Sequence, residues 1–143
     1  MSRKEVQKEL EKEFINKWKD QARIAYQNQD LKVNKEVKPE EALSPWVRFS
    51  VLMGAGEQVA MGSAAVQYRY VGVIAVQVFT AEGTGAQTNR DICDDVADIF
   101  RSKQIDSQNI SCQTPDIVEV GTDGGWWQVN VEIPFYWDEF TNP

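Results

Sequence analysis

VQYRYVGVIAVQVFT, residues 66–80, is the strongest strand signal in this chain of 143 residues, and it decides the fold. Valine, isoleucine, tyrosine and phenylalanine make up most of it, and these residues favour extended backbone. From Val71 to Val76 the residues of both faces are apolar, which is typical of a central strand covered on each side. We expect helices to cover one side and a neighbouring subunit the other, so Val71 and Val73 are candidate interface residues.

Another strand is predicted before this segment, at Trp46–Met53, where apolar residues alternate with Arg48 and Ser50. Residues 54–65 are rich in Gly, Ala and Ser, which predicts a long, flexible hairpin connection. We expect this connection to be mobile in the free subunit and to become ordered by a neighbour. Its three glycines are therefore candidate interface residues: Gly54, Gly56 and Gly62.

Two strands are predicted to close the chain, at Asp116–Gly121 and Trp126–Phe135, with a glycine turn at Asp123-Gly124-Gly125 between them. Alternate residues of the second strand are apolar, which predicts an antiparallel sheet buried on one face. Trp126 has the opposite register, beside polar neighbours, and is either an interface anchor or a residue packed under a helix. Pro134 predicts that the end of this strand is unpaired on one side.

A helix is predicted at about residues 3–19, where Ser2 and Glu5 have the capping-box spacing. Its apolar residues recur every four positions and predict a core-facing seam, with Ile15 beside them: Val6, Leu10, Phe14 and Trp18. A short strand at Arg23–Tyr26 and a long polar loop at 27–45 follow.

A second helix is predicted at about residues 86–102, with Thr84 and Gln87 as its capping box. Gly83-Thr84-Gly85 precedes it where a phosphate-binding loop would lie, but residue 88 is Thr, so Gly-x-Gly-x-x-Gly is incomplete. We therefore predict a strand-to-helix turn and no cofactor site. The apolar face of this helix contains Ile92, Cys93, Val96, Ala97, Ile99 and Phe100.

This order of elements predicts a single domain over residues 1–143. Its class is α+β, with an antiparallel or mixed β-sheet and two helices packed on one face.

The residue types that are missing exclude several kinds of chemistry. The chain has no histidine, which excludes Ser-His-Asp and Cys-His catalysis and most zinc sites. Cys93 and Cys112 are too few for a disulfide scaffold, and Cys93 is expected in the core. No apolar run approaches the roughly 20 residues that span a bilayer, and the charged N-terminus is unlike a signal peptide. We expect no enzyme activity, no metal and no membrane association.

Charge is unevenly distributed along the chain. Residues 1–90 carry 13 Lys and Arg against 11 Asp and Glu, whereas residues 91–143 carry 2 against 11. The acidic part repels phosphates and suits a basic protein partner. Arg48, Arg69 and Arg90 are isolated, without the aromatic interleaving of a nucleic-acid surface.

The second helix carries an acidic run at Asp91, Asp94, Asp95 and Asp98. Paired carboxylates can bind Mg²⁺ or Ca²⁺, but no Ca²⁺-loop pattern is present. We therefore interpret the run as a solvated face or a charge-matched contact surface.

From about residue 45 onward the sequence resembles the phage tail terminator-like family, in the manner of the lambda-type tail terminator. The N-terminal helix and residues 25–28 fit the usual opening of that family more loosely. Arg48 and Arg69 belong to the matching stretches and are candidate interface residues; where the family often has Arg-Arg, this chain has Tyr68 before Arg69. The stretches are PWVRF (45–49), YRYVG (68–72), VQVFT (76–80), GTG (83–85), IFR (99–101), GWWQVNV (125–131) and IPF (133–135).

The resemblance implies a structural virion protein that forms a homo-oligomeric ring, usually a hexamer. Such a ring caps the tail tube, ends tube polymerisation and offers a surface to head-tail connector or neck proteins. DNA passes through its lumen without being read. The protein would be assembled in the host cytoplasm and located in the virion tail.

Two alternatives stay open at this point. One is a neighbouring structural protein, either a head-tail completion protein or a tail tube subunit. The other is a small hydrolase or ligand-binding domain with carboxylate chemistry, which two converging carboxylates of raised pKa in a cleft would favour.

Overall fold

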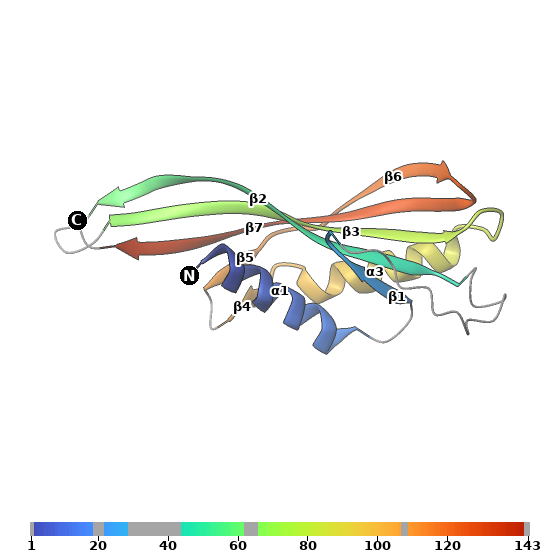
Figure 1. Cartoon of the computed structure of the whole chain (residues 1–143), viewed down its shortest axis with the longest axis horizontal. Coiled ribbons are helices and arrows are strands. Elements are labelled where there is room, and N and C mark those ends of the chain that lie inside the picture. The colour runs from blue at the N-terminus through green and yellow to red at the C-terminus, as the bar shows by residue number, and fades with distance from the viewer. Residues whose placement is uncertain (1, 19–21, 29–43, 62–65, 107–108, 142–143) are drawn as a thin grey trace.

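The computed structural model describes residues 2–18, 22–28, 44–61, 66–106 and 109–141. Figure 1 shows the two helices and seven strands of this part of the chain. In chain order they are α1 (Arg3–Lys17), β1 (Arg23–Tyr26), β2 (Trp46–Met61), β3 (Val66–Ala81), α3 (Gln87–Phe100), β4 (Gln104–Ile105), β5 (Ile110–Cys112), β6 (Asp116–Asp123) and β7 (Trp126–Thr141).

All the strands join one mixed sheet, in the order β1-β2-β3-β7-β5-β4, and β6 pairs with β7 as well. Among the described strands, β1 and β2 run parallel to each other, and the other pairs are antiparallel. Residues 66–80 form the central strand, because β3 is paired along its length with β2 and β7. The structure confirms the predicted α+β class.

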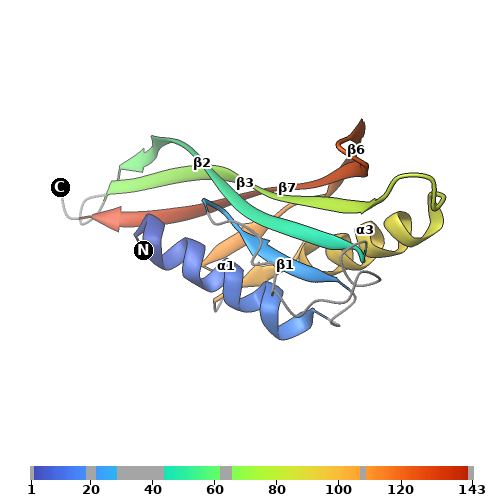
Figure 2. The same ribbon diagram turned by 45° about the vertical axis from the view of Figure 1, so that its right-hand side comes forward.

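Both helices lie on one face of this sheet (Figure 1 and Figure 2). The long strands β2, β3 and β7 extend past the helices at one end of the molecule, and β6 lies at the other end (Figure 1). We call the three-stranded extension the arm; it contains residues 54–61, 66–70 and 136–141. The opposite face of the sheet, which no described helix covers, is called the open face.

The core lies between the sheet and the helices, because alternate strand residues point toward α1 and α3. On α1 the predicted seam is buried, whereas Ile15 is 51% exposed and does not belong to it. The predicted apolar face of α3 is also buried. The strand residues in this core include Val47, Phe49, Val51, Ile74, Val76, Val78, Val129, Val131, Ile133 and Phe135.

The first prediction that the structure corrects is the flexible connection at 54–65. Strand β2 does not end at Gly54 but continues to Met61, with irregularities between Met53 and Gly56 and between Gln58 and Ala60. The reason is that β3 is long enough to offer backbone partners along this whole stretch, and bulges let the ladder continue. Residues 62–65, which include Gly62, lie outside the described residues.

The end of β7 is the second correction, because Pro134 lies inside a strand that continues to Thr141. The amide of Gln113 donates to the carbonyl of Pro134 at 2.8 Å, on the edge where β6 gives way to β5. In a strand the nitrogen and carbonyl of one residue face the same edge. The missing N–H of Pro134 therefore falls where β7 changes partners, and no ladder bond is lost.

The two capping boxes have different outcomes. At α1 the predicted box is present, because the Glu5 amide donates to Ser2 Oγ at 3.2 Å and the Ser2 amide donates to the Glu5 carboxylate at 3.4 Å. At α3 it is wrong: the N-cap is Ala86, without a side-chain bond, and Thr84 Oγ1 donates to the Ala81 carbonyl instead. Gly83 and Gly85, both at positive φ, turn the chain before the helix begins.

Candidate assembly surface

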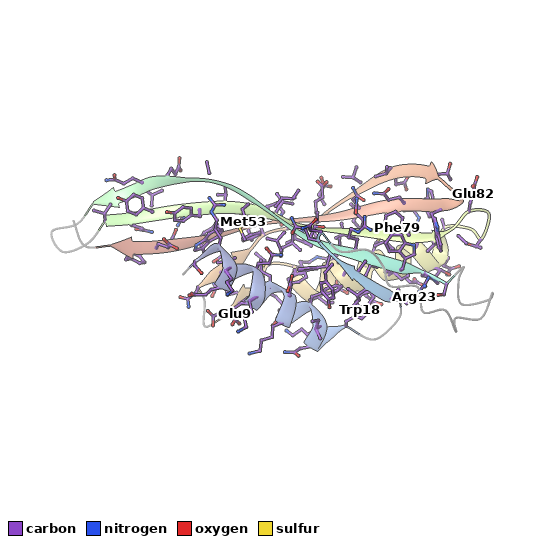
Figure 3. All side chains as sticks on the ribbon, viewed as in Figure 1. Glu9, Trp18, Arg23, Met53, Phe79 and Glu82 are labelled. Atoms are coloured by element: carbon purple, nitrogen blue, oxygen red, sulfur yellow. The ribbon has the colours of Figure 1, made fainter. Side chains whose placement is uncertain are left out.

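The open face carries every second residue of the three long strands. Cross-strand pairing places these residues in rows, so that Leu52, Val73 and Pro134 lie side by side, as do Arg69 and Asp138. In Figure 3, Glu9 and Trp18 lie with α1 on one side of the sheet, and Phe79 lies among the strands. The open face is therefore the largest sheet surface available for contacts with other molecules.

At the base of the arm the open face forms an apolar groove with a volume of about 410 Å³. Leu52 and Val71 in this groove are 55% and 47% exposed. Such exposure is unusual for large aliphatic residues that lie next to one another, and it makes this groove a candidate interaction surface. The main lining residues of this groove are Leu52, Gly54, Val71, Val73, Pro134 and Tyr136.

An ion pair fixes the border of the groove on the arm side. The Arg69 guanidinium donates two hydrogen bonds to the Asp138 carboxylate, at 2.9 and 3.1 Å, and Gln67 donates a third at 3.1 Å. The guanidinium also lies 4.3 Å from the centre of the Tyr136 ring. The hydrogen bonds and charge of Arg69 hold the pKa of the Asp138 carboxyl below its usual value. Arg69 thus joins β3 to β7 within one subunit.

We expect Asp138→Asn to lower the melting temperature slightly at neutral pH and not at strongly acidic pH. A carboxyl whose pKa is depressed by folding stabilises the fold above its unfolded pKa, at about pH 4 and higher, and loses that effect as pH falls through the folded pKa. Thermal unfolding at pH 7 and at pH 2–3 measures the difference. Arg69→Gln removes the same interaction and should give the same pH profile; a constant difference at both pH values would contradict the assignment.

A second cluster, the aromatic patch, occupies the other half of the open face. The Trp46 ring stacks on Phe79 with centroids 4.1 Å apart and meets the edge of Trp126 at 6.2 Å. The Arg48 guanidinium lies 5.4 Å from the Trp46 ring, and Arg48 Nε is buried without a hydrogen-bond partner among the described residues. Tryptophan and arginine are among the residues enriched in interface hot spots.

Strand β6 is a third exposed surface, at the end of the molecule away from the arm (Figure 1). Ile117, Val118 and Val120 are 41%, 38% and 55% exposed. Only one edge of β6 has a described partner, which is β7. Exposed apolar edge strands tend to pair or pack with other chains.

The acidic run, the glycine turn and the two cysteines do not form a catalytic or metal-binding site in the described part of the chain. Within the described ranges no three His, Cys, Asp or Glu side chains converge to hold a metal ion. Gly83 and Gly85 form an exposed turn, and Asp91, Asp94 and Asp98 are exposed on α3. Both cysteines are buried, and burial raises the pKa of each thiol to about 12. No described helix is long and apolar enough to cross a bilayer.

Residues 5–135 match the model of the family described as phage tail terminator protein. The chain belongs to this family. The protein is therefore a structural component of a bacteriophage tail. Among the solved structures that this tail terminator matches is one at 16% sequence identity, with a TM-score of 0.68, over 100% of this chain and 99% of the other. At such identity the likeness shows the fold alone, and no curated protein matches.

The structure brings the predicted interface residues of this tail terminator into two groups. Gly54, Val71 and Val73 line the groove, with Arg69 at its border, whereas Arg48 and Trp126 meet at the aromatic patch. Gly56 belongs to neither, because it lies against the Tyr70 ring on the helix side.

Sequence reasoning missed Pro134 and Tyr136, since the last strand was ended too early, and it missed the exposed edge of β6. The signal for β6 was available in the sequence. Three of the four residues in Ile117-Val118-Glu119-Val120 are apolar, and Ile117 and Val118 are adjacent, which breaks the strict alternation that burial on one face would produce.

Proposed function

We propose that this tail terminator assembles with copies of itself into a ring of six, which caps the tail tube and ends its polymerisation. The ring offers its outer end to head-tail connector or neck proteins, and DNA passes through the lumen without being read. The main support for the proposal is one observation. Within the described part of this tail terminator family member, no element covers the two separate apolar surfaces or the aromatic patch.

Separate surfaces are what a ring requires. A cyclic assembly uses two different patches of each subunit for its neighbours, and a terminator needs further patches for the tube and the neck. The groove, β6 and the aromatic patch supply three such surfaces. Because the chain carries a net charge of −7 and its described arginines form no continuous stripe, sequence-independent passage of DNA fits better than binding.

Tube length provides the test of capping. We expect purified protein to form a ring with a hole wide enough for duplex DNA in electron micrographs, either alone at high concentration or on tail tubes. Added to polymerising tube protein, it should shorten the tubes in proportion to its concentration. The control is the same protein heated until it unfolds.

Three outcomes would contradict the proposal. A protein that stays monomeric at high concentration and forms no ring on tubes is not a cap. A protein that itself polymerises into long tubes is a tube subunit. A ring that binds heads but leaves tube length unchanged is a head-tail completion protein.

A further inference from the structure

The base of the arm combines a strand irregularity with three glycines. Between Met53 and Gly56 the register of β2 shifts against β3, and such bulges bend a strand. Gly54 and Gly56 belong to this stretch of β2, and Gly72 lies across from it in β3. Glycine weakens the interior of a strand, because it has no side chain to pack and its backbone is unusually free. The local sequence therefore favours a hinge where the arm leaves the core.

Aromatic rings cover two of these glycines on the helix side of the sheet. A Cβ atom at Gly56 would lie 2.3 Å from Cε1 of Tyr70, its cross-strand partner. A Cβ atom at Gly72 would lie 2.5 Å from Cζ of Phe135, which is also a cross-strand partner. The rings thus occupy the space that side chains would take at these two positions. Rings laid over glycines of a neighbouring strand help to pin the register of a sheet.

Both rings belong to one stack that connects the arm to the core. The ring of Trp137 contacts both of the others, with centroids 5.2 Å from Tyr70 and 5.9 Å from Phe135 and interplanar angles of 18° and 17°. Phe135 and Trp137 are buried in the core, and Tyr70 packs against it. Helix α1 contacts the same stack, because the Arg3 guanidinium lies 5.9 Å from the Tyr70 ring centre and donates to the Gly54 carbonyl at 3.1 Å. We call these three rings the ring stack.

The arm has the exposure of a contact element. It extends past both described helices (Figure 1), and the apolar groove lies at its base. Val59 in β2 and Phe140 in β7 are 41% and 67% exposed on it. The direction of the arm relative to the core therefore decides where these apolar side chains meet a neighbouring copy.

We propose that the ring stack fixes the direction of the arm in the free subunit, so that the arm enters the assembly already in place. The inference rests on the proposed ring and deepens it by naming what positions one of its contact elements. An element that is ordered before contact loses little conformational entropy on association, so more of the contact energy remains as affinity. Tyr70 and Gly56 are positioning residues, because they act on the arm and need not touch the neighbouring copy.

The direction of the arm can be measured as a distance between two spin labels. Ile15→Cys on α1 and Val59→Cys on the arm provide the attachment points, since these side chains are 51% and 41% exposed. The native Cys93 and Cys112 are buried, and the pKa of each thiol is raised to about 12, so neither reacts readily at neutral pH. We expect pulsed electron paramagnetic resonance to give one narrow distance distribution for the free, otherwise unchanged subunit.

Two substitutions release the arm in different ways. Tyr70→Ala removes the outer ring of the stack and should broaden the distance distribution. Gly56→Ala keeps that ring but takes its space, so it should broaden the distribution as well. In the Tyr70→Ala background, Gly56→Ala should have no further effect, because the ring that it displaces is absent. Tyr68→Ala is the matched control, since Tyr68 lies two residues before Tyr70 on the same face of β3 and joins no ring stack among the described residues.

Assembly is measured by sedimentation on the unlabelled variants. Tyr70→Ala should need a concentration about 10-fold higher than the wild type, which is the effect of ordering one or two side chains on contact. Tyr68→Ala should assemble like the wild type. Circular dichroism shows whether each variant is folded at the temperature of the measurement. Gly56→Ala, the smaller change, provides the decisive comparison if Tyr70→Ala does not fold.

The possible failures are distinguishable. A broad distribution in the otherwise unchanged subunit would mean that the arm is not fixed, and a narrow one in Tyr70→Ala and Gly56→Ala would mean that the ring stack does not fix it. Equal broadening by Tyr68→Ala would contradict a special role of the stack. If Tyr70→Ala broadens the distribution but assembles like the wild type, assembly does not depend on the stack and the inference is wrong in that part. If the wild type never assembles, alone or on tubes, the proposed ring is wrong, whereas the distances still decide whether the stack holds the arm.

Discussion

Phe14→Ala is expected to destabilise the subunit by about 4 kcal/mol, within the range for removing a fully buried aromatic ring. Phe14 is 0% exposed, and its ring centre lies 5.0 Å from Trp18, 4.9 Å from Phe49 and 6.3 Å from Phe100. One side chain therefore joins α1 to the sheet and to α3. Removing the ring leaves a cavity, and the three surrounding rings cannot all move to fill it because they are fixed at different places in the fold.

Urea unfolding followed by fluorescence measures this change, and the melting temperature should fall by roughly 8–16 °C for a domain of this size. Ile15→Ala is the control, because Ile15 is the next residue of the same helix but is 51% exposed. Its cost should stay below about 0.5 kcal/mol. Similar losses for the two variants would mean that α1 is not held by the Phe14 seam.

Asn89→Asp should cost about 3 kcal/mol or more at neutral pH, although it changes only one side-chain group. Asn89 is 0% exposed. Its amide nitrogen faces the carbonyls of Val78 and Trp127, each at 3.4 Å, and Thr80 Oγ1 at 3.1 Å, while its oxygen accepts from Cys93 Sγ at 3.3 Å. A carboxylate at this place cannot donate to the two carbonyls, and burial would remove its charge from water.

The pH dependence identifies the cause. At low pH the introduced carboxyl is protonated in both the folded and the unfolded state. Burial raises its pKa in the folded state above the ordinary value, so the unfolded state ionises first as pH rises. The penalty, measured against the wild type at the same pH, therefore grows as pH rises through about 4 and levels off above the folded pKa. Asn16→Asp, exposed on α1, should cost less than about 1 kcal/mol. A penalty for Asn89→Asp that does not change with pH would point to lost packing and not to buried charge.

Much of the architecture could be predicted because the relevant signals are local and periodic. The seam from Val6 to Trp18 repeats every four residues, which specifies one face of a helix and is buried as expected. The glycine turn before Trp126 was predicted correctly, with Gly124 and Gly125 at positive φ between paired strands. Strands β4 and β5 were missed, because two or three residues are too few to show a period.

The errors arose where a distant partner overrides a local preference. Gly54 and Gly56 favour a loop, yet β3 holds this segment as a strand. Pro134 favours a strand end, yet the exchange of β6 for β5 leaves a place where no N–H is required. Both outcomes depend on segments that are far away in the sequence, and a local pattern contains no information about them.

The sequence by itself determined the fold class, the two amphipathic helices, the central strand and the family. Each of these depends on the order of residue types along the chain. Only the tertiary structure decided that Arg69 pairs with Asp138, that Arg48 and Trp126 meet around Trp46, and that Val71 and Pro134 line one groove. The most distant of these pairs, Trp46 and Trp126, is 80 positions apart in the sequence. A sheet that pairs β2, β3 and β7 brings them together, because the hydrogen-bond register fixes which side chains become neighbours on the open face.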